Sequence, residues 1–351
     1  MEEKPKAKKR IVICGGGNLG HVVAGFVSAQ RINEVCVLTR HPERWKKELV
    51  VETPEGGELR GELSGVYSDA SKAVSGADVV LLCLPGYSIR EVLVQIKDFL
   101  TVSTAVGSVV SSTGFFFEAM RILPDDVPLF GFQRVPFISR TVEYGCRARL
   151  LGYKDSLSVA IEHTEDKEQL RGILLQMLKT PVTLLQSFYE ASLSNSNPLL
   201  HPARLYDLWN DWHEGMVYEH EALFYEEWTK QAASFYIAMD MELQSLLSVL
   251  PVRKDCLPTV LNYYESTDAD SLAQKLRSIE AFKGIKAPMK KTASGYVPDF
   301  QSRYFTEDFP YGLAIVSRLA HEKGVSVPVM DRVLEWGMGI IAKEEEKKAL
   351  K

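Results

Sequence analysis

The chain has 351 residues, of which 46% are hydrophobic and 25% are charged, and this composition excludes disordered, collagen-like and fibrous proteins. A length of this order predicts two domains of about 100 to 200 residues each. The formal net charge of −5 lacks the basic excess of nucleic-acid-binding proteins, and no apolar run reaches the roughly 18 residues that cross a bilayer.

The first residues and the cysteines favour a cytoplasmic protein. Met1–Arg10 is rich in lysine and lacks the apolar stretch of a secretory signal. The five cysteines form no Cys-x-x-Cys pair, and three of them lie within apolar runs. We therefore predict buried, reduced thiols rather than a disulfide framework or a zinc site.

Strand-like runs alternate with helical patterns along the N-terminal half. The sequence predicts strands over residues 10–14, 34–38, 78–84 and 105–110, and helices over 21–30 and 88–100. The run DVVLLCL at 78–84 does not alternate, which is typical of a parallel strand that is buried on both faces. Strands separated by helices predict an α/β Rossmann domain with a doubly wound, mainly parallel sheet.

The pattern changes between residues 145 and 161, where two short apolar runs are joined through Lys154 and Asp155. These runs predict either a hairpin or an extension of the sheet. A helix over 170–178 and a last strand over 182–185 follow.

The second half has a helical pattern. Apolar and aromatic residues recur at helical spacing from 201 to about 250 and again from 313 to 342. We predict a dinucleotide-binding domain over residues 1–185 and a mostly helical domain for substrate binding and catalysis over 186–351.

A glycine-rich segment follows the first predicted strand and precedes the first predicted helix. It reads Gly15-Gly16-Gly17-Asn18-Leu19-Gly20 and satisfies the G-x-G-x-x-G pattern. In this pattern the first glycine permits a tight turn, the second lets a pyrophosphate approach the backbone, and the third lets the helix pack closely on the sheet. The helix N-terminus adds free N–H groups and partial positive charge. The segment therefore predicts a dinucleotide site at Gly15, Gly17, Asn18, Leu19 and Gly20.

The choice of cofactor depends on the end of the second strand. An NAD site usually has a carboxylate about 20 residues beyond the glycines, where it binds the ribose 2′-hydroxyl. Here that position is occupied by Arg40, with Arg44 one turn later and no carboxylate between the end of the strand and Glu43. Arginines can pair with a 2′-phosphate, so the sequence favours NADP(H) over NAD(H). The alternative is that both arginines are solvated surface charges.

A second cofactor contact is predicted after the strand at 78–84. Ligands of open α/β sheets bind beyond the carboxyl ends of the strands, where Leu84-Pro85-Gly86-Tyr87 lies. Pro85 would border the nicotinamide. An ordinary turn at the end of the strand is the alternative.

Most of the seven histidines have no acidic or metal-ligating residue at a spacing that would indicate catalysis or metal binding. We expect His21, His41, His163 and His321 to be surface or cap residues. The segment 213–220 contains two histidines but neither HExxH nor HxxEH, because the required positions hold Val217 and Met216. We expect it to form the polar face of an aromatic-rich helix, and we predict no metal site.

His201 is the exception, because it ends the amide-rich stretch Ser194-Asn195-Ser196-Asn197-Pro198-Leu199-Leu200-His201-Pro202. Pro202 suits a first helical turn, which would place His201 at a helix entrance near the junction of the two predicted domains. Active sites concentrate at such junctions. The alternative is a histidine that only caps the helix.

A third segment, QSRYFTEDFPYG at 301–312, combines charged and aromatic residues between two helical regions. Arg303 could bind a substrate carboxylate through two parallel hydrogen bonds, and Asp308 could orient a histidine. In isolation the segment could equally be a surface loop with a capping aspartate.

Taken together, GGGNLG, SNSNPLLHPARL and QSRYFTEDFPYGL resemble the octopine/nopaline (opine) dehydrogenase family over about residues 9–340. The resemblance implies a Rossmann domain followed by a helical domain, and a reaction in which NADH or NADPH reductively joins an α-keto acid, commonly pyruvate, to an amino acid through an imine. It implies that His201 is the catalytic histidine, Asp308 its acidic partner and Arg303 a ligand of the substrate carboxylate.

Several points stay open at this stage. Asn195, Asn197, Tyr206, Trp209 and Asn210 lie near His201 in sequence and could bind substrate, with Asn197 the residue we select. The amino acid substrate is not specified. We expect small-molecule partners, neither nucleic acid nor membrane, and a homodimer as one of the oligomeric states open to the chain.

Two other functions compete with this prediction. One is an NADP-dependent reductase of 2-keto or hydroxy acids, as in the ketopantoate reductase or glycerol-phosphate dehydrogenase groups, which usually transfer protons through a lysine. Lys230 is the only lysine from 201 to 250 and has no recognisable partner. The other is a protein that senses NADP(H) without turnover, which would need neither a histidine–aspartate pair nor an arginine for a carboxylate.

Overall fold

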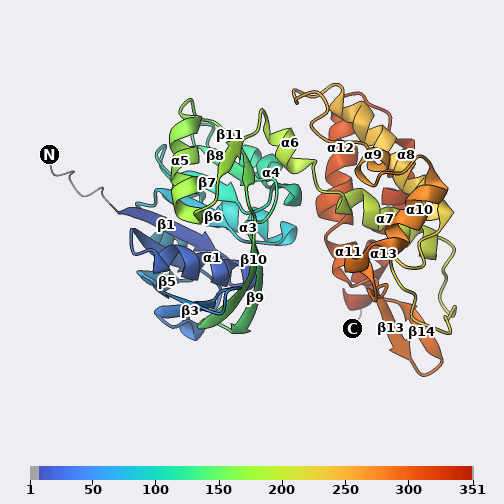
Figure 1. Ribbon diagram of the computed structural model, residues 1–351, viewed down its shortest axis with the longest axis horizontal. Helices are drawn as coiled ribbons and strands as arrows, with labels where there is room; N and C mark the ends of the chain where they lie inside the picture. Colours follow the sequence, from blue (N-terminus) through green and yellow to red (C-terminus); the bar gives the residue numbers. More distant parts are fainter. Residues whose placement is uncertain (1–7, 350–351) are drawn as a thin grey trace. The chain divides into compact units, whose positions relative to one another are not determined.

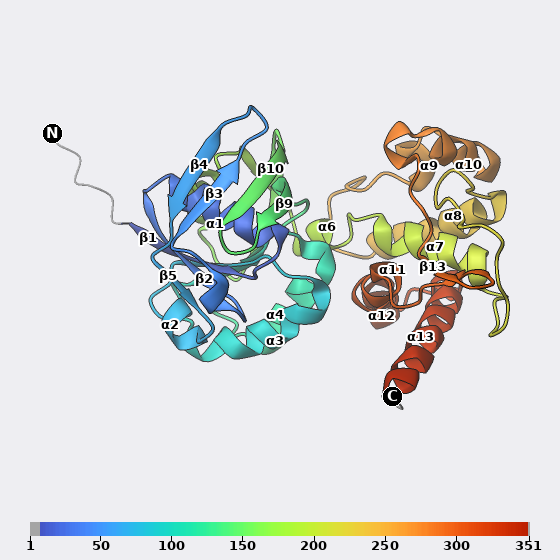
Figure 2. The same ribbon diagram turned by 90° about the horizontal axis from the view of Figure 1, so that it is seen from below.

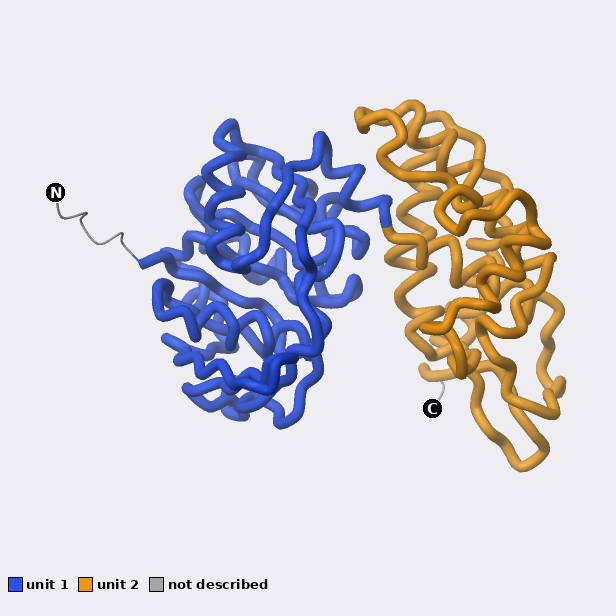
Figure 3. Tube along the Cα trace, viewed as in Figure 1, with its two compact units in different colours: residues 1–194 blue, residues 195–351 orange. Residues whose placement is uncertain are grey.

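The computed structural model describes residues 8–349 and divides the chain into two compact units, which meet in sequence between Ser194 and Asn195 (Figures 1 and 3). Most of the N-terminal segment Met1–Arg10 lies outside the described residues. Within that range, no helix has both the length and the apolar character needed to span a bilayer.

The first unit is built on an eight-stranded sheet of order β12-β11-β8-β7-β6-β1-β2-β5. Its strands are β1 (Lys9–Cys14), β2 (Asn33–Leu38), β5 (Gly65–Tyr67), β6 (Val79–Leu82), β7 (Ala105–Ser108), β8 (Leu129–Phe132), β11 (Leu157–Glu162) and β12 (Val182–Leu184). Every pairing is parallel except that of β11 with β8. The prediction of a doubly wound, mainly parallel sheet is confirmed.

Helices cover both faces of this sheet. One face carries α1 (Asn18–Ala29) and α5 (Lys167–Leu178), and the other carries α2 (Ala70–Val74), α3 (Gly86–Ile96), α4 (Phe115–Ile122) and α6 (Phe188–Ser192). Along β6, Val79 and Leu81 join the core on the first face, whereas Val80 and Leu82 join the core on the second. A strand that is buried on both faces needs apolar residues at every position, which explains its unbroken apolar run.

The helix α6 explains why the first unit extends beyond the predicted boundary after residue 185. Ala191 of this helix is fully buried in the core that includes Leu129 of β8. The residues after β12 therefore pack on the Rossmann sheet, and the compact unit ends at Ser194.

A second, four-stranded sheet of order β4-β3-β10-β9 covers α1 from the side opposite the large sheet (Figure 2). It consists of β3 (Glu48–Glu52), β4 (Glu58–Glu62), β9 (Phe137–Glu143) and β10 (Arg147–Tyr153). The hairpin considered for 145–161 is wrong, because β10 pairs with β9 and β3 whereas β11 extends the large sheet. Local alternation shows that a segment is extended, but it does not identify the partner strand.

The second unit is a helical bundle with one hairpin. Its elements are α7 (Asn197–Trp209), α8 (Lys230–Leu247), α9 (Val260–Tyr263), α10 (Ala269–Ser278), β13 (Met289–Thr292), β14 (Gly295–Pro298), α11 (Arg303–Thr306), a π-helical turn η5 (Phe309–Leu313), α12 (Ala314–Glu322) and α13 (Pro328–Ala349). Helices α7, α8 and α13 pack against one another. Short 3₁₀ turns complete the chain: η1 (Pro42–Arg44), η2 (Lys97–Phe99), η3 (Ser111–Thr113) and η4 (Glu280–Phe282).

The structure corrects the predicted helix from 201 to about 250. Residues 210–229 form turns and extended backbone, so the segment 213–220 is not the polar face of a helix. Three aromatic residues of this stretch instead pack together in the core: Phe224 and Trp228 are completely buried, and both rings contact that of Tyr225. The hairpin β13–β14 was also not predicted, because its strands have only four residues each and lack an apolar alternation.

Candidate functional site

The glycine-rich loop joins β1 to α1 with a different role for each glycine. Gly15 has a φ of +117°, and a Cβ there would lie 2.7 Å from the carbonyl oxygen of Cys83. A Cβ on Gly20 would collide with the carbonyl of Gly15, so the helix could not pack as closely on the loop. By contrast, a Cβ on Gly17 would meet nothing within 4 Å. Space above Gly17 is what a pyrophosphate needs in order to reach the backbone N–H groups.

A pocket of about 570 Å³ opens beside this loop, beyond the carboxyl ends of β1, β2 and β6. Five of the predicted cofactor residues line it: Gly15, Gly17, Arg40, Arg44 and Pro85. The other three lie outside the lining. The Oδ1 atom of Asn18 accepts a hydrogen bond of 2.8 Å from the backbone N–H of Thr141, Leu19 packs on the core, and Gly20 lies beneath the loop.

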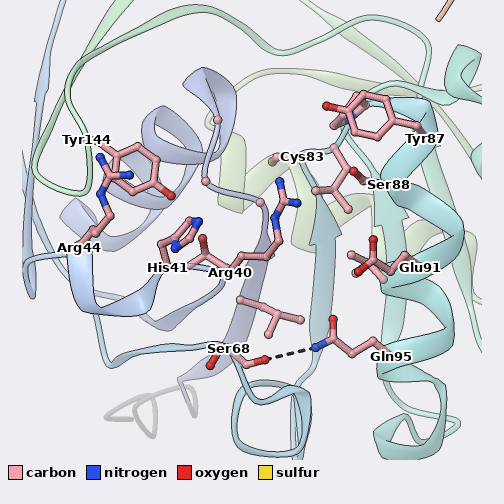
Figure 4. A pocket seen from close by; sticks show the side chains of 18 residues that line it. Arg40, His41, Arg44, Ser68, Cys83, Tyr87, Ser88, Glu91, Gln95 and Tyr144 are labelled. Atoms are coloured by element: carbon pink, nitrogen blue, oxygen red, sulfur yellow. Dashed lines mark hydrogen bonds between the residues drawn. The ribbon is translucent and has the colours of Figure 1, made fainter. Parts of the chain in front are cut away.

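The charged groups of the pocket are mainly basic. Arg40 reaches into the pocket, and Arg44 lies across Tyr144, with its guanidinium carbon 4.4 Å from the ring centroid (Figure 4). Glu91 on α3 is the one carboxylate among the described lining residues. Pockets with an excess of arginine attract phosphate, and a stacked guanidinium is held in place for it.

His21 and Tyr144 are the residues near this pocket that sequence reasoning missed. The prediction that His21 is a surface or cap residue is wrong, because its exposed fraction is 1%. Tyr144 lines the pocket from the turn between β9 and β10, far from the glycine loop in sequence. Only the pairing of distant strands brings these residues to the loop.

The second unit brings His201 and Asp308 together. The Nδ1–H of His201 donates a hydrogen bond of 2.8 Å to Oδ2 of Asp308. Both side chains are largely buried, with 9% and 19% exposed. Because the carboxylate can only accept a hydrogen bond, it fixes the Nδ1–H tautomer of a neutral imidazole and leaves Nε2 as an acceptor.

The remaining ring nitrogen of His201 faces Tyr225. The Tyr225 hydroxyl lies 3.2 Å from Nε2 and donates to it when the imidazole is neutral. Burial raises the pKa of Tyr225 well above its usual range, so the side chain stays a neutral donor. Its ring stacks on Phe282 with 4.0 Å between centroids. No sequence signal pointed to Tyr225, because it lies in the irregular stretch after α7.

Neighbouring helices position the pair. His201 lies inside α7, which begins at Asn197 with Pro198 in its first turn, so the predicted place at a helix entrance is wrong. A Cβ on Gly312 would lie 2.9 Å from Pro198, which shows how closely η5 approaches α7. Asp308 immediately precedes η5, and π-helical turns of this kind are frequent at functional sites.

Two further contacts fix the residues that surround the His201 side chain. Tyr304, one turn before Asp308, presents its ring edge-on to the imidazole with 4.5 Å between centroids. The buried guanidinium of Arg204 donates a hydrogen bond of 3.0 Å to the carbonyl of Phe224. This bond holds the irregular stretch in place next to Tyr225.

Arg303 and Asn197 lie close in sequence to the pair, with Arg303 before Asp308 and Asn197 before His201. Arg303 donates through Nε and Nη2 to the two carboxylate oxygens of Glu307, at 2.8 and 2.6 Å. Its side chain is 80% exposed. Asn197 is half-buried at the start of α7, one turn before His201 and on the same face of the helix.

Comparison with known proteins covers both units. The family described as NAD/NADP octopine/nopaline dehydrogenase, alpha-helical domain, matches residues 184–341, and the family described as NADP oxidoreductase coenzyme F420-dependent matches residues 10–107. The opine dehydrogenase of Haliotis discus hannai is 29% identical, over 96% of this chain and 91% of its own length. The helical unit therefore belongs to the octopine/nopaline dehydrogenase family, and the chain as a whole is similar to opine dehydrogenases. This similarity makes the chain an NAD(P)-dependent oxidoreductase of the opine dehydrogenase type, which acts on CH–NH bonds.

Two other opine dehydrogenases are similar over the same extent. The tauropine dehydrogenase of Arabella iricolor is 28% identical, over 95% of this chain and 92% of its own length. A solved octopine dehydrogenase with NADH and L-arginine superposes with a TM-score of 0.84 at 27% identity, covering 95% of this chain and 90% of that one. Both units therefore have the fold of an opine dehydrogenase.

Proposed function

We propose that this opine dehydrogenase uses NADPH to join a small, pyruvate-like α-keto acid to an amino acid. The amine and the keto acid condense to an imine with loss of water, and reduction of the imine carbon gives a secondary amine. Bound NAD(P)H supplies the hydride. The observation that carries the proposal is the buried pair of His201 and Asp308 in the helical unit of this family.

His201 is the proposed acid–base group of this reaction. It would supply or remove the proton at the reacting oxygen or nitrogen, the general acid–base role that histidine most often has in enzymes. Asp308 would keep the imidazole in the Nδ1–H tautomer and stabilise the imidazolium that forms. Arg303 would bind the carboxylate of the keto acid, and Asn197 would contact substrate from the same face of α7 as His201.

The cofactor preference rests on Arg40 and Arg44. The solved octopine dehydrogenase described above holds NADH, which is a fact about that protein. In this chain two arginines line the pocket where the second strand ends, against the single carboxylate of Glu91. Such a lining favours the 2′-phosphate of NADPH over a neutral ribose diol.

The amino acid substrate is left open by the named relatives, because one is an octopine dehydrogenase that holds L-arginine and another is a tauropine dehydrogenase. The function is tested by following NADPH oxidation with pyruvate and a panel of amino acids, against pyruvate alone. We expect oxidation to require one of the pairs. Oxidation with pyruvate alone would instead identify a keto acid reductase, and no oxidation with any pair would favour a protein that only senses the cofactor.

The role of Arg303 gives a prediction about substrate affinity. Arg303→Lys keeps the charge but loses the planar fork, so we expect the KM for the keto acid to rise about tenfold with a smaller change in kcat. Steady-state kinetics at saturating NADPH measure both. Arg318→Lys is a matched control, because Arg318 also faces a glutamate four residues later in the same unit, with 3.8 Å between Nε and the Glu322 carboxylate. An unchanged KM in Arg303→Lys would remove Arg303 from the keto acid site.

Tyr225 gives a prediction about proton transfer. Since its hydroxyl is hydrogen-bonded to Nε2 of His201, we propose that Tyr225 passes the proton between His201 and the substrate. Tyr225→Phe keeps the ring that stacks on Phe282, and we expect kcat to fall about tenfold or more with an altered pH profile. Tyr264→Phe is the control, since it removes another buried tyrosine hydroxyl of the same unit. A kcat and pH profile equal to those of the wild type would limit Tyr225 to packing.

A further inference from the structure

His21 joins the glycine loop to the turn between β9 and β10. Its Nδ1 atom lies 2.9 Å from the carbonyl oxygen of Gly17, and its Nε2 atom lies 2.7 Å from the backbone nitrogen of Gly145. The carbonyl can only accept a hydrogen bond and the N–H can only donate one. The imidazole therefore has its proton on Nδ1 and a free electron pair on Nε2, and it must be neutral to make both bonds.

The turn that His21 holds is shaped for this contact. Gly145 has a φ of +73°, and a Cβ there would collide with the backbone of Arg44. Its carbonyl accepts a hydrogen bond of 2.9 Å from the N–H of Lys46. Trp45 lies between Arg44 and Lys46 in the sequence, and its ring stacks on His21 with 4.2 Å between centroids. One imidazole thus contacts the glycine loop, the segment after η1 and the β9–β10 turn.

Tyr144 connects this arrangement to the cofactor pocket. It precedes Gly145 in the turn, and its ring lies edge-on to His21 with 5.0 Å between centroids. The guanidinium of Arg44 stacks on the same ring. A Cβ on Gly16 would lie only 2.6 Å from its hydroxyl oxygen. Any shift of the turn therefore moves a wall of the pocket and the side chain on which Arg44 rests.

We propose that His21 is a positioning residue for the dinucleotide: as a neutral imidazole it holds the Tyr144–Gly145 turn against the glycine loop, and its protonation releases the turn and weakens cofactor binding. An imidazolium carries a hydrogen on Nε2, which would point at the N–H of Gly145 and replace a hydrogen bond with two opposed donors. His21 does not line the pocket and acts through Gly17 and Tyr144. The proposal concerns binding only and does not depend on which substrates are joined.

The surroundings favour the neutral form near pH 7. Burial lowers the pKa of His21, and the bond to the Gly17 carbonyl opposes this in part. The charged or titratable groups around it are Arg44 above Tyr144, and Lys46, which pairs with Glu143 and contacts Cys146. A histidine whose pKa is lowered by folding is neutral at every pH above the pKa that it has in the unfolded chain, and it becomes protonated as the pH falls. We therefore expect the loss of cofactor affinity at acidic pH.

The test measures dinucleotide affinity at a series of pH values from about 8 down to the lowest pH at which the protein stays folded, because burial moves the protonation of His21 to the acid side of the ordinary histidine titration. NAD⁺ and NADP⁺ are both titrated by calorimetry, because the 2′-phosphate titrates only in NADP⁺. In the wild type we expect the affinity for both to fall about fivefold toward acid. In His21→Gln, which cannot be protonated, we expect the affinity for NAD⁺ to be independent of pH.

His41→Gln is the matched control, because His41 also lines the pocket but is exposed and lies 3.4 Å from Glu43. We expect His41→Gln to keep the acid loss of affinity. A loss that disappears in His41→Gln, or that persists in His21→Gln, would overturn the proposal.

A measurement on the unaltered protein covers the case in which His21→Gln does not fold. The ring nitrogens of seven histidines are few enough to resolve by ¹⁵N NMR. We expect His21 to show the Nδ1–H tautomer at neutral pH, and we expect bound NAD⁺ to delay its protonation to lower pH. An Nε2–H tautomer, or a titration that NAD⁺ leaves unchanged, would refute the role of His21.

Discussion

Replacing His201 with alanine is expected to lower kcat by about a thousandfold or more, because the variant loses the group that exchanges the proton. The affinity for NADPH should stay nearly the same, since all the described residues that line the pocket belong to the first unit. Turnover is measured by NADPH oxidation with the active substrate pair, and affinity by calorimetry. A large loss of NADPH binding in this variant would contradict the assigned role.

His321→Ala is a matched control for this variant. His321 lies in the same unit and also contacts an aspartate, with 3.1 Å between Nε2 and Oδ1 of Asp331, but its side chain is 59% exposed. We expect this variant to retain wild-type turnover. Asp308→Asn adds a second test, because an amide can present an N–H to Nδ1 and so disfavour the productive tautomer. We expect its kcat to fall without loss of fold.

Replacing Arg40 with alanine is expected to weaken NADPH binding by about ten- to a hundredfold, the usual range for a hydrogen bond to a charged group. NADH lacks the 2′-phosphate, so its affinity should change little. The Kd values of both cofactors for the wild type and the variant measure the effect. An equal loss of affinity for NADPH and NADH would contradict the proposed preference for NADPH.

Arg121→Ala provides the control for charge alone. Arg121 lies on α4 of the same unit, its side chain is 59% exposed, and it does not belong to the described pocket lining. We expect its removal to leave the ratio of the two Kd values unchanged. If Arg121→Ala altered that ratio as much as Arg40→Ala, general electrostatic attraction rather than a specific contact would explain the preference.

The cofactor unit was predictable wherever its signals are local. The strand at 10–14, the glycines and the following helix are consecutive in sequence. Gly15 and Gly20 are required by close contacts with the backbone of Cys83 and of Gly15, whereas Gly17 leaves the space that a pyrophosphate needs. The second sheet was not predictable in this way. Its strands come from residues 48–62 and 137–153, and they meet on the face of α1 that points away from the large sheet.

The histidines show the same division. His201 was recognisable as a candidate because an unusual run of asparagine, serine and proline precedes it. His21 looked unremarkable, because its partners Trp45 and Gly145 lie far along the chain. Tyr225 was missed because the stretch that carries it has aromatic residues at helical spacing but is not a helix.

The sequence by itself therefore determined the Rossmann architecture, the glycine loop and the family, since these depend on residues that are close together or on whole segments with a distinctive order. The tertiary structure decided which side chains touch. It placed Asp308 and Tyr225 on opposite ring nitrogens of His201, and His21 between Gly17 and Gly145. These contacts depend on the packing of segments separated by up to 124 residues, and no local pattern encodes that packing.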